Sequence, residues 1–204
     1  MRFDHVIITT PDLDRTAERW VRRGFDVLPG GRHEGIGTAN RIVPLGAGYV
    51  ELLTVADGEE AAASRFGGWA LATLAEDERL MGWALAVDAV EPIAARLGTG
   101  TDVIARSGLR ALTAGLAEAA VRPERPFFIA REPGTPDPGA VAAQHRIPVD
   151  GLATLVLGGT RAGIEDWCQT QLDLDAIELT FDATQHGLLG GSIRSAGRGL
   201  PLLG

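Results

Sequence analysis

The feature that most constrains the fold of this chain is a pattern of strand and helix signals that recurs about every 70 to 80 residues. The first copy, residues 1–56, opens with a β-branched stretch at residues 3–9 and continues into an amphipathic helix that stops at Gly24. Three further strand candidates follow, at residues 25–28, 40–44 and 49–55. The predicted order of this copy is strand-helix-strand-strand-strand.

A second, weaker copy of the same order occupies residues 81–135. It begins with a strand at residues 83–87 and continues into a short apolar helical stripe that closes at Gly98. Its last three strands are expected at residues 102–106, 109–116 and 127–131. The stretch between the two copies, residues 57–80, is rich in alanine, glycine and glutamate and predicts a linker with a short helix.

A partial third copy occupies residues 150–204, with a strand at residues 152–157, a helix, and two strands at residues 177–181 and 191–195 that are expected to form a hairpin. One such unit cannot cover the concave face of its own sheet, so two units side by side enclose a cleft. We therefore predict an α+β fold of paired βαβββ modules, whose curved mixed sheets surround a cleft. The third module is expected to pack on the same domain.

Composition excludes several kinds of chemistry. All 19 basic side chains are arginine, so the chain has no lysine for a Schiff base or a P-loop. The 27 acidic side chains give a net charge of −8, which argues against nucleic acid and anionic membrane as partners. The single cysteine, Cys168, makes no internal disulfide, and the N-terminus lacks the apolar run of a signal peptide. We therefore expect a cytoplasmic protein.

Two polar residues, on the first and last strands of the first copy, are expected to face the cleft. Glu51 lies between Val50 and Leu52, so strand alternation directs it to the face opposite theirs. His5 lies on the first strand, and an imidazole beside a carboxylate suits a divalent metal ion. The alternative is that Glu51 pairs with an arginine and His5 makes a local hydrogen bond.

A glycine-rich run between strands concentrates polar groups near the same cleft. It holds His33, Thr38 and Asn40, and two arginines, Arg32 and Arg41, flank His33. Glycines let backbone N–H groups approach a ligand, and arginine binds a carboxylate or phosphate through paired hydrogen bonds. We expect the run to bind substrate, with His33 as a base or orienting group. The alternative is a hairpin loop whose glycines only meet the turn geometry.

Residues 3–20, FDHVIITTPDLDRTAERW, resemble the opening strand and helix of the vicinal oxygen chelate superfamily, which includes glyoxalases, bleomycin-resistance proteins and extradiol dioxygenases. One branch, the glyoxalase-like domain proteins of undefined activity, is similar to this chain at residues 29–33, 37–41, 44–46, 49–52 and 126–129. The resemblance covers most of the chain. It is specific over residues 3–55 and weak over residues 150–204.

The resemblance implies a metal site that this chain carries only in part. His5 and Glu51 stand where the superfamily has its first-strand and last-strand ligands. In the second copy, Trp83 takes the position of His5, and Ile129 or a neighbour takes that of Glu51. Trp83 is expected to stack on a ring or acyl group of the substrate, or to fill a cavity that lost its metal. His145 is the candidate third ligand, with a solvated loop histidine as the alternative.

Two functions follow from the resemblance. The first is a glyoxalase-like enzyme of undefined reaction, a lyase, isomerase or dioxygenase. Its divalent metal, Mn, Fe, Ni or Zn, would be held by His5, Glu51 and His145, and its substrate would chelate through vicinal oxygens. The second is a metal-free protein that sequesters an aromatic or acyl small molecule, as the antibiotic-resistance members do. Exposed sheet edges favour a homodimer.

Overall fold

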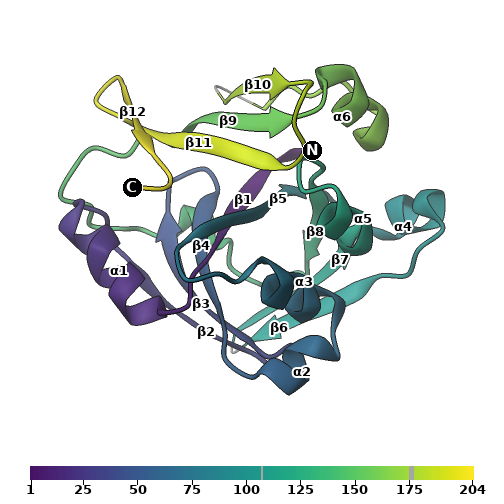
Figure 1. The fold of residues 1–204 in the computed structure, drawn as a ribbon, viewed down its shortest axis with the longest axis horizontal. Helices are drawn as coiled ribbons and strands as arrows, with labels where there is room; N and C mark the ends of the chain where they lie inside the picture. The colour runs from purple at the N-terminus through teal and green to yellow at the C-terminus, as the bar shows by residue number, and fades with distance from the viewer. Residues whose placement is uncertain (107, 175–176) are drawn as a thin grey trace.

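A computed structural model describes residues 1–106, 108–174 and 177–204 of the chain. The fold is α+β, as predicted, with a strongly curved sheet of eight strands and a second sheet of four (Figure 1). None of the helices in these ranges is long and apolar enough to cross a membrane.

The elements follow the predicted order, with several additional short helices and one additional strand. The first copy contains β1 (Arg2–Thr9), α1 (Leu13–Arg22), β2 (Leu28–His33), β3 (Thr38–Pro44) and β4 (Tyr49–Val55). Two helices then follow, α2 (Gly58–Ala62) and α3 (Arg65–Thr73). The second copy contains β5 (Arg79–Ala86), α4 (Glu91–Leu97), β6 (Asp102–Arg106), β7 (Leu109–Ala114), α5 (Leu116–Val121) and β8 (Phe127–Arg131). After a short 3-10 turn (Pro138–Ala140), the third contains β9 (Leu152–Gly158), α6 (Arg161–Cys168), β10 (Glu178–Asp182), β11 (Leu188–Ser195) and β12 (Arg198–Pro201).

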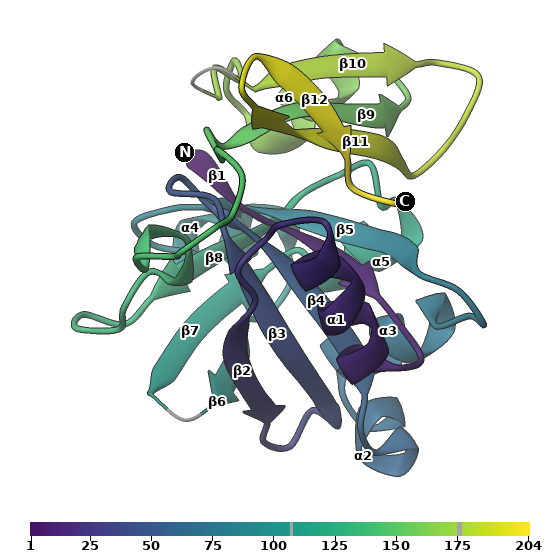
Figure 2. The ribbon, with the colours of Figure 1, turned by 90° about the vertical axis from the view of Figure 1, so that its left-hand side faces the viewer.

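The first two copies join at the centre of one sheet, whose strand order is β2-β3-β4-β1-β5-β8-β7-β6. Within each copy the first and last strands are parallel, and β1 and β5 pair antiparallel across the junction. The sheet curls so far that its two edge strands come together (Figure 2). Close to this contact, the Glu34 N–H donates to the Ala105 carbonyl at 3.2 Å. The concave face is therefore nearly enclosed.

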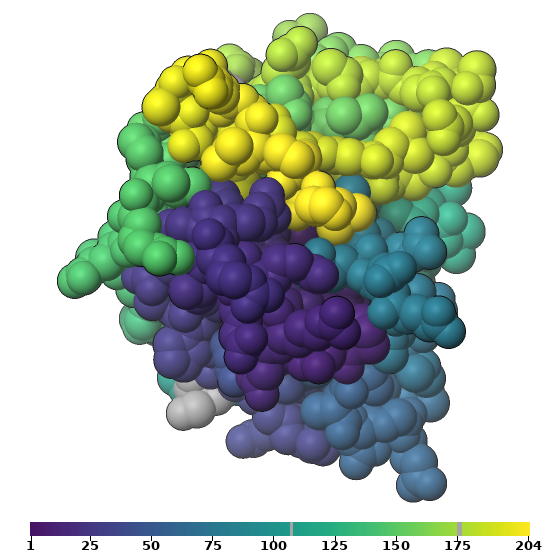
Figure 3. Space-filling view, turned by 60° about the vertical axis from the view of Figure 1, so that its left-hand side comes forward, coloured from purple at the N-terminus to yellow at the C-terminus, as the bar shows by residue number. Residues whose placement is uncertain are grey.

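Helix α1 covers the outer face of the first copy. Asp12 caps its start by accepting from the Arg15 N–H at 2.9 Å, and the helix is followed by Gly24, whose φ of +100° suits glycine. Trp20 is fully buried against the sheet. Arg23 lies over the Trp20 ring at 4.7 Å and donates to the Leu202 carbonyl at 3.4 Å, so the C-terminal segment packs against this helix (Figure 3).

The second sheet packs on the outer face beside α1, with β11 lying against β5 (Figure 2). Trp167 of α6 stacks on Phe128 of β8, with ring centroids 6.0 Å apart. In this sheet β10 runs parallel to one side of β9 and β11 runs antiparallel to the other. The predicted hairpin of residues 177–181 and 191–195 is therefore wrong, because β9 lies between the two strands.

The inner face carries its own apolar core, covered by α3 and α5. Trp69 of α3 packs so closely on Gly82 that a Cβ there would stand 2.3 Å from the indole ring. Helix α5 was not expected, because residues 109–116 predicted one strand. Gly115, with φ of +80°, ends β7 and lets the chain turn into the helix.

Candidate functional site

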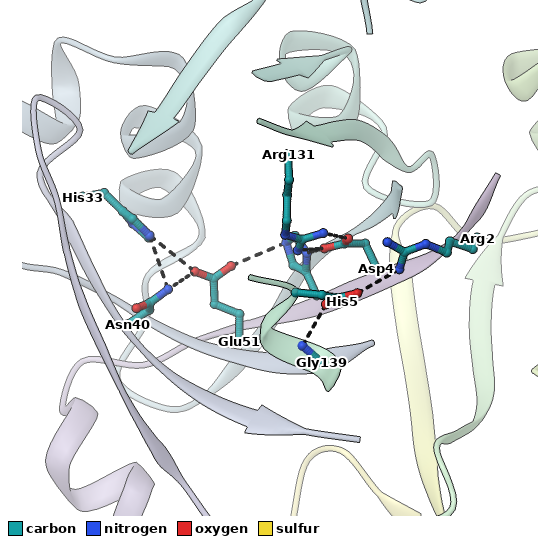
Figure 4. A network of polar contacts seen from close by, with 9 residues as sticks. Arg2, Asp4, His5, His33, Asn40, Glu51, Arg131 and Gly139 are labelled. Carbon is teal, nitrogen blue, oxygen red and sulfur yellow. Dashed lines mark hydrogen bonds and ion pairs between the residues drawn. The ribbon is translucent and has the colours of Figure 1, made fainter. Parts of the chain in front are cut away.

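The site begins at a bulge in β1. Phe3 pairs with Leu85 and His5 pairs with Ala84 on β5, so Asp4 is an extra residue between the two pairs. Neighbouring residues of a regular strand point to opposite faces, but at this bulge the Asp4 carboxylate contacts the His5 ring, with 2.6 Å between Oδ1 and Nδ1 (Figure 4). Both side chains are buried. The bulge thus joins an aspartate and a histidine that are adjacent in sequence.

Arg131, at the end of β8, binds the same carboxylate through both terminal nitrogens, with Nη2 at 2.8 Å from Asp4 Oδ1. Burial alone would raise the pKa of Asp4, but the hydrogen bonds from His5 and Arg131 outweigh it and hold that pKa well below its usual range. Burial would also lower the pKa of Arg131, yet its hydrogen bond to Asp4 raises it. Asp4 and Arg131 are therefore a fully charged pair inside the sheet.

His5 turns its other nitrogen, Nε2, toward the interior of the curved sheet. This atom is buried and has no hydrogen-bond partner in the described part of the chain. It lies 3.5 Å from Oε2 of Glu51 on β4. The imidazole stacks on Tyr49 at 4.7 Å and meets Phe127 edge-on at 5.5 Å, so its plane is fixed on both sides.

The second carboxylate oxygen of Glu51, Oε1, faces side chains of the glycine-containing strand β2 and of its neighbour β3. Asn40 donates to Glu51 Oε1 at 2.5 Å and accepts from the Gly31 N–H at 2.9 Å. His33 Nε2 lies 3.8 Å from Glu51 Oε1, and its Nδ1 lies 2.8 Å from the Thr38 hydroxyl. Burial lowers the pKa of His33, although the charge of Glu51 opposes this shift. His33 is therefore held in the neutral form.

These groups surround a small cavity of about 20 Å³. The side chains that line it come from both copies and from α3: His5, His33, Asn40, Ile42, Tyr49, Glu51, Phe66, Ile104, Arg106, Leu109, Ile129 and Arg131. Such a space holds about one water molecule. The chain therefore presents a buried imidazole nitrogen and a buried carboxylate to a space of atomic size.

Comparison with known proteins identifies the family. A model of the glyoxalase-like domain matches residues 3–172. The chain belongs to the glyoxalase-like domain family. It is thereby a member of the vicinal oxygen chelate superfamily, in agreement with the curved βαβββ sheet.

Several solved structures are similar to this glyoxalase-like chain at low sequence identity. A hypothetical protein from Staphylococcus aureus has a TM-score of 0.63 and 16% identity, over 89% of this chain and 86% of that one. A methylmalonyl-CoA epimerase variant of Streptomyces coelicolor has a TM-score of 0.46 and 20% identity, over 67% and 98%. The epimerase of Mycobacterium tuberculosis has a TM-score of 0.44 and 17% identity, over 65% and 87%. No curated protein matches the sequence.

The glyoxalase-like domain brings together most of the polar residues singled out in its first copy. His5, Glu51, His33 and Asn40 line one cavity, and Thr38 is the buried partner of His33. His33 and its neighbours lie on strands, because β2 extends over residues 28–33 instead of the predicted 25–28. A Cβ at Gly30 would stand 2.0 Å from Asn40 Oδ1, so glycine here lets β2 approach β3 rather than form a loop.

Four other predicted residues lie elsewhere. Arg32 and Arg41 point outward, where they pair with Glu60 and Asp14 respectively. Trp83 does not take the position of His5, because Ala84 pairs with Phe127 as His5 pairs with Tyr49. Trp83 pairs with Val6 and lies in the core of the outer face, where its N–H donates to the Glu124 carbonyl. His145 accepts from the Asp26 N–H at 2.9 Å, and its Nε2 lies 2.9 Å from the Pro44 carbonyl oxygen. Both of its nitrogens are thus engaged in a loop contact away from Glu51.

Sequence reasoning missed Asp4, Arg106 and Arg131. Strand alternation could have identified Arg131, because it lies two residues after Ile129 on β8 and both side chains face the same cavity. No such signal existed for Asp4, since regular alternation directs it away from His5 and only the bulge reverses this. Arg106 ends β6 and reaches the cavity because the sheet curls until β6 meets β2.

The divalent ion that the superfamily implies can be tested against these residues. His5 Nε2 is an orphaned buried atom whose ring is oriented by a carboxylate on Nδ1, an arrangement common among metal-binding histidines. Its distance of 3.5 Å to Glu51 is close to the roughly 3 Å that separates neighbouring ligands around such an ion. Across the described ranges, no group of three His, Cys, Asp or Glu side chains is arranged to hold a metal. The pair therefore fits an ion whose other ligands are water or substrate.

Proposed function

We propose that this chain is a small-molecule enzyme of the vicinal oxygen chelate type, and that it binds a divalent ion at His5 and Glu51. The observation that carries the proposal is His5 Nε2, which has no hydrogen-bond partner among the described residues and is buried 3.5 Å from a carboxylate oxygen of Glu51. A buried polar atom without a hydrogen bond lowers the stability of the folded state, because it has lost its contact with water. A ligand that binds this atom would restore the lost interaction. Lysine plays no part in this chemistry, because the chain has none.

The charges around the pair support a cation. Asp4 and Glu51 are acidic, Arg131 is basic, and burial favours the neutral form of His33. Asp4 and Arg131 neutralise each other as an ion pair, which leaves the Glu51 carboxylate as the charged group beside His5 Nε2, while Arg106 lines the side of the cavity that meets Ile42 and Leu109. A buried carboxylate next to an imidazole nitrogen attracts a divalent cation.

The side chains of the first copy would then divide the work. A divalent ion, when bound, polarises a substrate oxygen. His33 is a neutral imidazole whose Nε2 faces Glu51 and Asn40, so it would accept a proton from the substrate at that nitrogen. Asn40 holds the carboxylate in place, and Asp4 fixes the His5 ring. Thr38 orients His33 from its other side.

A second function, a metal-free protein that sequesters an aromatic or acyl molecule, is favoured by a separate observation. The inner face of the second copy lines the cavity with Ile104, Leu109 and Ile129 and with two arginines, none of which suits a metal ion. A site with apolar walls on one side suits retention of an organic ligand without chemistry.

The two functions are separated by elemental analysis and thermal unfolding of protein purified without chelator. We expect stoichiometric Mn, Fe, Ni or Zn and a melting temperature that rises on addition of the ion. Glu51→Gln, which keeps the shape of the side chain, should weaken ion binding by about 100-fold. Glu132→Gln is the matched control, because Glu132 is a half-exposed partner of Arg110. Absence of the ion and an unchanged melting temperature would contradict the enzyme and favour the sequestering protein.

A further inference from the structure

The polar cavity continues into an apolar groove. The cavity, at about 20 Å³, is far too small for an organic substrate. A groove of about 390 Å³ lies next to it, and Ile42, Arg106 and Leu109 line both spaces. A substrate that reaches His5 and Glu51 therefore has room for its larger part in the groove.

Four separate segments form the groove. Strand β2 contributes Leu28 and Pro29, β3 contributes Ile42, and the β6–β7 hairpin contributes Arg106, Gly108 and Leu109. The loop after β8 contributes three apolar side chains, Pro136, Pro138 and Val141. Apart from Arg106, every side chain that lines the groove is apolar, and Val141 is 42% exposed. The groove thus suits an aliphatic or aromatic group of moderate size.

Arg106 stands where the groove meets the cavity. Its Cδ would lie 3.5 Å from a Cβ at Gly31, so its stem runs along the bare backbone of β2. Within the described residues, its guanidinium makes no hydrogen bond or ion pair. The Arg106 side chain lines both the groove and the cavity that holds His33. By contrast, Arg131 is committed to Asp4. Arg106 is therefore a cation available to a ligand.

We infer that groove and cavity form one elongated site for an apolar α-keto or α-hydroxy acid. The apolar substituent lies in the groove, the carboxylate binds Arg106, and the neighbouring keto or hydroxyl oxygen points to the His5–Glu51 pair. This inference names the substrate class of the proposed function and rests on it for the last of these contacts. The contacts of the groove and Arg106 stand on their own, and binding alone tests them.

The test is calorimetric titration of the metal-free full chain with phenylpyruvate. Two related compounds each remove one feature: pyruvate lacks the ring and phenylacetone lacks the carboxylate. Arg106→Gln should weaken phenylpyruvate binding by about 10- to 100-fold and leave phenylacetone unchanged. Val141→Ser should weaken both aromatic compounds by about 3- to 10-fold and leave pyruvate unchanged. Arg110→Gln and Val103→Ser are matched controls, since Val103 is 40% exposed and neither residue lines the groove.

The outcomes separate this inference from the proposed function. Binding that depends on Arg106 and Val141 but not on their controls supports the inference. No phenylpyruvate binding to the wild type, or equal binding of phenylpyruvate and phenylacetone, overturns it. Ion binding that Glu51→Gln removes would in that case leave the proposed function intact. Phenylpyruvate binding without any ion binding would instead support the inference and sink the proposed metal site.

Discussion

The two copies that build the eight-stranded sheet share a backbone plan but differ on the inner face. The first copy contributes both histidines, the amide and the carboxylate that line the cavity, and the second contributes apolar residues and two arginines. In the first, His5 pairs with Tyr49, and Glu51 lies two residues further along β4. In the second, Ala84 pairs with Phe127, and Ile129 lies two residues further along β8.

The strand pairing therefore places Ala84 and Ile129 where the first copy has His5 and Glu51. A duplicated sheet does not require duplicated chemistry, because its stability comes from the apolar faces that both copies share. The second copy supplies a wall and the charge of Arg131, which acts on the first copy through Asp4. The site is asymmetric even though the fold is nearly symmetric.

The largest effect is expected from the outer face, where the second copy is structural. Trp83→Ala should lower the free energy of unfolding by about 3–5 kcal/mol, because a fully buried indole leaves a cavity and its partner carbonyl loses a donor. Chemical denaturation measures this. Phenylpyruvate binding by the folded fraction should be unchanged. A loss of binding without a loss of stability would show that Trp83 contacts the substrate.

The next effect tests the bulge that joins the copies. Asp4→Asn removes the anionic partner of both His5 and Arg131, and should weaken ion binding by about 10- to 100-fold. Titration of the purified variant measures it. Asp14→Asn is the control, because Asp14 is largely exposed and pairs with Arg41 on the outer side. Equal ion affinity in Asp4→Asn and wild type would show that Asp4 does not position His5.

Asp4 also predicts a pH dependence of stability. Its pKa is depressed in the folded state, so the unfolded chain binds its proton first as the pH falls. The stabilisation is complete above the unfolded value of about 4 and is lost below it. The melting temperature of the wild type should therefore fall more steeply than that of Asp4→Asn below that pH. Parallel curves would contradict the charged Asp4–Arg131 pair.

A smaller effect is expected from His33, in a higher pH range. Burial lowers its pKa, so between that lowered value and about 6.5 the unfolded chain binds a proton that the folded chain does not. Stability should fall as the pH falls through this window. His33→Gln should flatten the slope, whereas His186→Gln, at an exposed histidine, should not. Identical slopes in all three proteins would be inconsistent with a neutral buried His33.

The smallest effect is expected on the outer side of the first copy. Arg41 pairs at 3.0 Å with Asp14, whose side chain is largely exposed, and exposed pairs of this kind contribute about 0–1 kcal/mol. Arg41→Gln should therefore change neither phenylpyruvate binding nor stability by more than about 0.5 kcal/mol. A large loss of binding would show that the outer arginines take part in the site.

Much of this asymmetry was readable in the sequence. The β-branched strands and their alternation located β1 and β4, and they directed His5 and Glu51 to one face. Prediction failed where the local pattern was interrupted. The Gly30-Gly31 pair made β2 look like a loop, and the bulge turned Asp4 to a face that regular alternation does not predict. Gly115 ended β7 and began α5 inside a stretch predicted as one strand. The roles predicted for His145 and Trp83 were wrong for two reasons. The sequence does not show which groups a loop histidine will bind, and it does not show the register in which β5 pairs with β1.

The contact between β2 and β6 joins parts of the chain that are far apart in sequence. Within the eight-stranded sheet, β1 and β5 are the paired strands that join the two copies, and the other pairs each lie within one copy. A contact of such long range must overcome a large loop-closure entropy before it adds stability. We therefore expect both copies to fold before this seam closes. In the folded protein, this contact should also be the first to open during fluctuations. The Glu34 amide, which bonds across it, should therefore exchange with solvent faster than the amides of β1.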